Sequence, residues 1–154
     1  MDACAELCSL LERLAGAPDG HERSPRGYLR EVGRQTAGIR LGPLWAWDAI
    51  RGGRNRLPGT GFAAPFDDST RGQARHFGGI VAVAARIGPR LARWGSIHIG
   101  RDRPDTPDGR LSDAAIEFAR LVTEGRLVPA DAAGWLRGRL CAPGAAHPPA
   151  ERLS

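Results

Sequence analysis

Apolar residues recur every three or four positions along several segments of this chain, which is the spacing of an amphipathic α-helix. The segments with this spacing are residues 3–14, 25–39, 43–50, 70–87, 112–125 and 129–140, with a shorter run at 90–94. The alternation at 96–99 is too brief to establish a strand. The sequence therefore predicts an all-α fold, a compact bundle of five or six helices joined by long loops rich in glycine and proline.

The segment from Thr70 to Ile87 is predicted to be the central helix. Thr70 and Gln73 fit a capping box, and the preceding Asp67 and Asp68 lie where the helix dipole favours negative charge. Beside the apolar stripe of this helix lies a second stripe of small residues around one histidine, formed by Gly72, His76, Gly79 and Val83. Neighbouring helices are therefore expected to pack closely on both stripes. The helix predicted at 25–39 has a thinner apolar side and is expected at the surface.

Local signals also set the remaining boundaries. Ser24 before Pro25 is a helix start, Ser112 is expected to cap the helix after the polar loop 100–110, and Gly125 is expected to end that helix in the left-handed conformation. Residues 52–66 show no periodicity, and a loop of this length is usually functional or disordered. We expect a single helical domain at 1–141 and a flexible proline-containing tail at 142–154.

The charge of the chain favours one function class without establishing it. All 22 basic residues are arginine, 17 residues are acidic, and the net charge is +5. Clustered cations favour phosphate, so non-specific nucleic-acid binding is one hypothesis. Abundant alanine, glycine and proline without lysine is instead typical of a GC-rich genome. Arg26, Arg30 and Arg34 form a charged stripe that fits either a helix entering a nucleic-acid groove or an ordinary solvated face. The sequence has no helix-turn-helix motif and no aromatic stacking platform, which favours the solvated face.

The cysteines and the absent motifs restrict the chemistry further. Cys4, Cys8 and Cys141 are an odd number without framework spacing, so we expect reduced, buried thiols, with Cys4 and Cys8 on one helix face. No Walker A, dinucleotide or paired-histidine motif is present, so neither cofactor nor metal is expected. No secretory signal or apolar stretch of membrane-spanning length is visible, which predicts a cytoplasmic protein without membrane contact.

One group of side chains is a candidate for catalysis. His76, with Asp67, Asp68 and Arg75 nearby in sequence, has the composition of a general base or proton shuttle. Contact between His76 and Asp68 requires the loop before the helix to fold back over its first turn. One hypothesis is a small hydrolase or toxin-like enzyme; the sequence favours a structural histidine bonded to a carbonyl of loop 52–66.

The tryptophans indicate a surface for a partner. Trp45 and Trp47 differ by about 200° around a helix, so both cannot face one core. One is left for a partner, unless a second core packs there. We therefore favour a small accessory or adaptor protein that binds a macromolecule, a protein above all, through Trp45, Trp47 and the arginines at 26, 30 and 34. The sequence does not indicate an oligomeric state.

Overall fold

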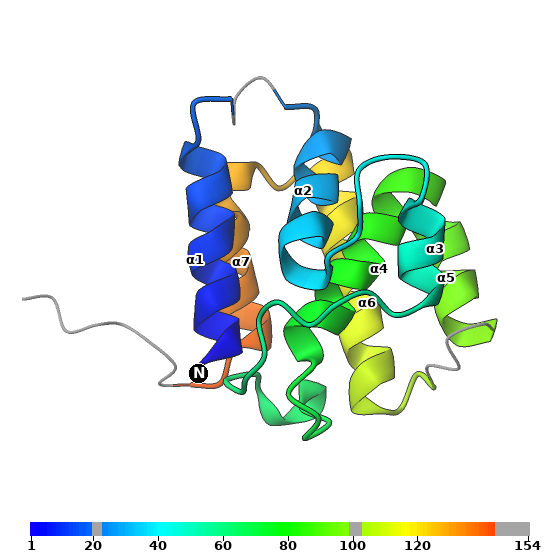
Figure 1. Ribbon diagram of the computed structural model, residues 1–154. Coiled ribbons are helices and arrows are strands. Elements are labelled where there is room, and N and C mark those ends of the chain that lie inside the picture. Colours follow the sequence, from blue (N-terminus) through cyan, green and yellow to red (C-terminus); the bar gives the residue numbers. More distant parts are fainter. Residues whose placement is uncertain (20–22, 99–102, 144–154) are drawn as a thin grey trace, which may run out of the picture.

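The fold is built from helices alone. The computed structural model describes residues 1–19, 23–98 and 103–143, and these contain seven α-helices, one 3-10 helix and no strand (Figure 1). The elements are α1 (Ala3–Gly16), α2 (Pro25–Ala37), α3 (Trp45–Ile50), η1 (Ala64–Phe66), α4 (Gln73–Ile87), α5 (Pro89–His98), α6 (Pro107–Thr123) and α7 (Pro129–Leu140). The all-α prediction is confirmed, with seven helices instead of five or six. Helices α3 and α5 both pack on α4, and α5 also packs on α6.

Helix α4 lies at the centre, as predicted. It contacts α1, α2, α3, α5 and α6, while α7 packs mainly on α1. Figure 1 shows α1 and α7 on one side of α4 and α3 and α5 on the other. Aromatic rings join the layers, since the Phe118 centroid lies 5.4 Å from that of Phe77 and 5.5 Å from that of Trp135. Such tilted pairs add stability beyond the apolar area they bury.

Helix α2 is buried against α4, so its predicted surface position is wrong. Seven of its residues are buried. Two glycines allow the close approach: a Cβ on Gly33 would lie 2.3 Å from the Cβ of Ala82, and one on Gly78 would lie 1.6 Å from the Thr36 hydroxyl oxygen. The face of α4 that α2 approaches therefore carries Gly78 and Ala82. The predicted stripe with Gly79 is also wrong, because Gly79 has open space beside it.

Two helix starts follow the same chemistry. Ser24 caps α2 by accepting from the Gly27 N–H at 3.0 Å, with Pro25 next, as predicted. Thr106 caps α6 in the same way, accepting from the Gly109 N–H at 3.1 Å before Pro107. Ser112 is therefore inside α6 and does not cap it. Gly125 has φ 72°, the predicted left-handed conformation after α6.

The predicted capping box at the start of α4 is also wrong. The helix begins at Gln73, its N-cap is Gly72, and no side chain caps it. Thr70 lies before the helix and bonds to Asp68 instead. Ser69 and Arg71 have φ of 67° and 61°, a conformation unusual for residues other than glycine, so the chain turns sharply before α4.

Loop 52–66 connects helices through its backbone. The Arg54 N–H donates to the Ala37 carbonyl at 2.6 Å, the Ala3 N–H donates to the Thr60 carbonyl at 2.8 Å, and the Ala63 N–H donates to the Leu140 carbonyl at 2.7 Å. Loop 52–66 therefore ties the ends of α1, α2 and α7 together, which gives it a structural role.

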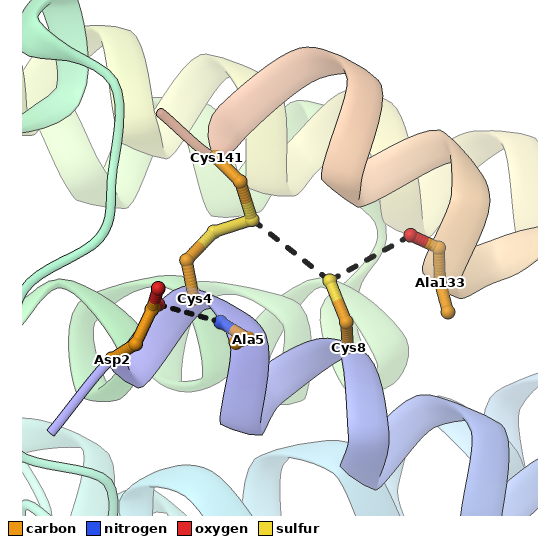
Figure 2. Close-up of a disulfide and its surroundings, with 6 residues drawn as sticks. All are labelled: Asp2, Cys4, Ala5, Cys8, Ala133 and Cys141. Atoms are coloured by element: carbon orange, nitrogen blue, oxygen red, sulfur yellow. Dashed lines mark hydrogen bonds between the residues drawn. A yellow bond between two sulfur atoms is a disulfide. The ribbon is translucent and has the colours of Figure 1, made fainter. Parts of the chain in front are cut away.

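The cysteines correct a prediction. Cys4 and Cys141 form a disulfide, so they are not reduced thiols; Cys8 is free and buried (Figure 2). Cys4 and Cys8 share a face of α1, as their spacing predicts. The Ala142 N–H donates to the Gly61 carbonyl at 2.8 Å, so the chain is still tied down where the tail was expected to begin. The rest of that tail, 144–154, lies outside the described residues.

Across the part of the chain that the structure describes, no helix combines the length and the apolar character needed to cross a bilayer.

Candidate functional site

Large apolar side chains are exposed on one part of the surface. Ten such residues are exposed among those described, and eight of them lie in or beside α3 and α5. We call these eight the α3–α5 surface; they are Leu41, Leu44, Trp47, Ile50, Ile87, Leu91, Trp94 and Ile97. Single exposed apolar residues are normal on folded proteins, whereas contiguous apolar patches are typical of interaction sites.

Helices α3 and α5 are held at the same end of α4. Arg86, near the end of α4, donates to the Arg40 carbonyl at 2.9 Å just before α3, and its guanidinium lies 5.0 Å from the Trp45 ring centroid. Helix α5 begins at Pro89, directly after α4. Helices α3 and α5 therefore lie on the side of α4 opposite α1 and α7 (Figure 1).

The two tryptophans of α3 point in different directions, as the helical spacing predicts. Trp45 packs on a small second core of Ala37, Ile39 and Ala82. Trp47 is 52% exposed, with the Arg51 guanidinium 4.5 Å from its ring centroid. Trp45 thus anchors α3, and Trp47 is the tryptophan that α3 presents to solvent.

The rim of the α3–α5 surface is basic. Arg40 is paired with Asp48, and Arg93 is paired with Asp113. The exposed Arg51, at the end of α3, and Arg90, in α5, form no ion pair with another described residue. The charge of Arg54 acts on Asp48 and helps to lower its pKa. Arg51 and Arg90 therefore leave positive charge beside the exposed apolar residues.

Asp48 fixes α3 in place. Its carboxylate accepts from the Arg40 side chain through Nε and Nη2, both at 2.8 Å, and from the Arg40 backbone N–H at 2.9 Å. These bonds lower the pKa of Asp48 to about 2, and the bonds from the Arg40 side chain have the largest effect.

This lowered pKa predicts an acid-dependent loss of stability. Ionised Asp48 stabilises the fold above its ordinary pKa of 3.8, and the contribution declines below that value and is absent below about pH 2. Asp48→Asn is expected to flatten the dependence of the free energy of unfolding on pH in this window. Urea unfolding followed by tryptophan fluorescence measures it. An unchanged slope in Asp48→Asn would contradict the prediction.

The predicted arginine stripe on α2 does not form a free basic face. Arg26 is exposed, but the Nε of Arg30 is buried without a hydrogen-bond partner among the described residues. Arg34 is bonded to Glu31, and this bond lowers the pKa of Glu31 although burial opposes its ionisation. One of the three charges is therefore paired within α2, and the charge of Arg30 acts on Arg86, whose pKa it helps burial to lower.

A second candidate site surrounds His76, in the first turn of α4. Its Nε2 lies 2.7 Å from the hydroxyl oxygen of Ser112 on α6. The His76 ring is half-buried, whereas Ser112 is 1% exposed. This bond joins α4 to α6. The sequence had favoured a bond from His76 to a carbonyl of loop 52–66, and the structure shows Ser112 as its partner instead.

The two predicted carboxylates lie over the start of α4. Gln73 Nε2 donates to Asp67 Oδ1 at 2.9 Å and to Asp68 Oδ1 at 2.5 Å. Thr70 donates to Asp68 Oδ1 through its N–H at 2.9 Å and its hydroxyl at 2.7 Å. The sharp turn at 69–71 therefore folds the loop back, which is the condition for Asp68 to approach His76.

Asp68 is held ionised by its neighbours. Burial opposes its ionisation, but the bonds from Thr70, a hydrogen bond with Asp108 and the nearby charge of His76 hold its pKa below the ordinary range. Arg75 is exposed, and its guanidinium lies beside Gly72, where an added Cβ would come within 3.3 Å of its Nη2.

No family model, curated protein or solved structure matches this chain.

Sequence reasoning missed several residues of both sites. Ser112 and Asp108 join the His76 group because α6 starts at Pro107; the Thr106-Pro107 pair was the available signal. Trp94 and Leu91 were missed because α5 was expected to be only a short run. Their exposure depends on which face of α5 meets α4 and α6, and periodicity does not reveal that.

Proposed function

We propose that this protein is a small helical adaptor that binds an acidic partner protein with the α3–α5 surface. The observation that carries the proposal is the concentration of exposed apolar side chains there, with Trp47 at 52%, Trp94 at 55% and Ile50 at 77% exposed. Aromatic residues are enriched at the centres of protein interfaces, and arginine is enriched there relative to lysine.

The charge of the rim defines the partner. Arg51 and Arg90 are exposed and form no ion pair among the described residues, so an acidic surface gains attraction and a basic one is repelled. An amphipathic helix with acidic flanks fits, because its apolar face can pack on Trp47 and Trp94 while its carboxylates meet the rim. Association with such a partner should weaken as salt screens the rim.

Capture from a native extract with the double variant Trp47→Ser, Trp94→Ser tests the proposal. Wild type is expected to retain an acidic protein that the double variant loses, because both rings leave the interface. Val128→Ser is the matched control, since Val128 is 49% exposed but lies outside the α3–α5 surface. Equal capture by all three proteins, or capture of none, would refute the proposal. The proposal would also be refuted if the wild-type protein bound anionic phospholipid vesicles and this binding abolished its capture of the acidic protein.

The His76 group supports a second function, hydrolysis of a small substrate. The supporting observation is the half-buried His76 ring, oriented by the Ser112 hydroxyl at 2.7 Å and placed near the ionised Asp68. His76 would accept a proton from an attacking water, and Asp68 would stabilise the imidazolium that forms. Ser112 is too buried to attack a substrate, so it serves as a positioning residue. The unusual φ values of Ser69 and Arg71 agree with this, because strained backbone concentrates at functional sites.

A panel of nitrophenyl carboxylic and phosphoric esters tests this second function. His76→Gln is expected to lower the hydrolysis rate about 100-fold, the scale of a general base. Ser112→Ala should shift the pH profile of the rate, because it removes the bond that orients the ring. Val128→Ser, at an exposed residue outside both sites, is the control and should keep wild-type activity. Absence of hydrolysis in wild type, or equal rates in wild type and His76→Gln, would exclude catalysis by His76.

A further inference from the structure

Three sulfur atoms meet between α1 and the end of α7. Cys4 and Cys141 form the disulfide, and the Sγ of Cys8 lies 3.9 Å from the Sγ of Cys141 (Figure 2). The Cys8 thiol also lies 3.7 Å from the carbonyl oxygen of Ala133, to which it donates. Both cysteines of α1 therefore face Cys141.

We propose that Cys141 exchanges its disulfide partner between Cys4 and Cys8. In this step the Cys8 thiolate attacks the Sγ of Cys141. A Cys8–Cys141 bond forms as the Cys4–Cys141 bond breaks, and Cys4 leaves as a thiolate that takes up the proton lost by Cys8. One disulfide and one thiol are present before and after, so neither oxidant nor reductant is consumed.

The placement of the three residues allows either pairing. Residues four apart on a helix have neighbouring side chains, so Cys4 and Cys8 present their sulfurs to the same point. Cys141 follows the last residue of α7 and has extended backbone. It is 9% exposed, whereas Cys4 and Cys8 are fully buried. In both pairings α1 stays covalently joined to the chain after α7, so the exchange moves the crosslink by one helical turn without releasing it.

The charged surroundings of Cys8 make the exchange dependent on pH. Burial raises its pKa to about 11; the charge of Arg137 on α7 opposes this, and Glu12 on α1 and Asp2 before it add to it. Because the thiolate is the nucleophile, the exchange rate should rise about tenfold per pH unit up to a pH near that value. Near neutral pH the thiol form predominates, so the exchange is slow there.

Peptide mapping of the full-length protein tests the exchange. Glu6 lies between Cys4 and Cys8, so a glutamate-specific protease separates the two cysteines. Wild type incubated with iodoacetamide at increasing pH is expected to accumulate label on Cys4, with Cys8 and Cys141 joined. Cys8→Ser is the control and should keep Cys4 unlabelled. Label confined to Cys8 at every pH would overturn the proposal.

The variant Cys4→Ser provides an independent arm. Air oxidation of this variant is expected to give a Cys8–Cys141 disulfide, seen as a crosslinked peptide that a reductant separates. Far-ultraviolet circular dichroism establishes that the variant is helical before oxidation. A helical Cys4→Ser protein that keeps both remaining thiols free, under conditions that crosslink wild type, would also overturn the proposal.

Discussion

Gly78→Ala is expected to lower the free energy of unfolding by roughly 3 kcal/mol, at the upper end of the usual cost of overpacking. The added Cβ would lie 1.6 Å from the hydroxyl oxygen and 2.7 Å from the Cβ of Thr36. Rotation of the Thr36 side chain does not move its own Cβ, so α2 and α4 must separate. Urea unfolding followed by circular dichroism measures the loss.

Gly79→Ala is the matched control, on the same helix one residue further. Apart from the two neighbouring residues and the backbone of its own helix, no atom lies within 4 Å of a Cβ placed at Gly79. Alanine is the better helix former, so this variant is expected to gain up to about 1 kcal/mol. Equal stability changes in the two variants would show that the close contact of Gly78 with Thr36 does not govern the packing of α2 on α4.

Cys141→Ser is expected to lower the free energy of unfolding by as much as about 5 kcal/mol under oxidising conditions. The disulfide joins residues 137 positions apart, so it greatly restricts the unfolded chain, and loss of Cys141 removes the partner of both Cys4 and Cys8. Thermal and urea unfolding with and without reductant measure the effect. Wild type in reductant should resemble Cys141→Ser, and Cys8→Ser should retain the crosslink. Equal unfolding midpoints for oxidised wild type and Cys141→Ser would contradict the prediction.

Structural features that depend on interactions within one segment of the chain were predicted well. The spacing of apolar residues identified the central helix, and Ser24 with Pro25 marked the start of α2 because capping depends only on neighbours in sequence. The same reasoning failed at Thr70, because the preceding loop supplies a carboxylate that accepts from its hydroxyl and its backbone N–H. Asp68 takes both donors of Thr70, and α4 begins three residues later than expected.

The candidate sites were predicted only in part, because each combines residues from separate helices. Sequence reasoning named His76 and Asp68, but Ser112 and Asp108 come from α6 and join them only when α6 packs on α4. Trp47 was named, and Trp94 was not. Exposure of a tryptophan depends on which face of its helix finds a neighbour.

The sequence by itself determined the all-α class, the central helix and the divergence of Trp45 and Trp47, because helical periodicity and capping act between residues a few positions apart. Only the tertiary structure decided that Gly78 rather than Gly79 meets α2, that Cys141 pairs with Cys4, and that Ser112 bonds to His76. These outcomes depend on how whole helices rotate and approach one another, and packing contacts between residues far apart in the chain set that arrangement.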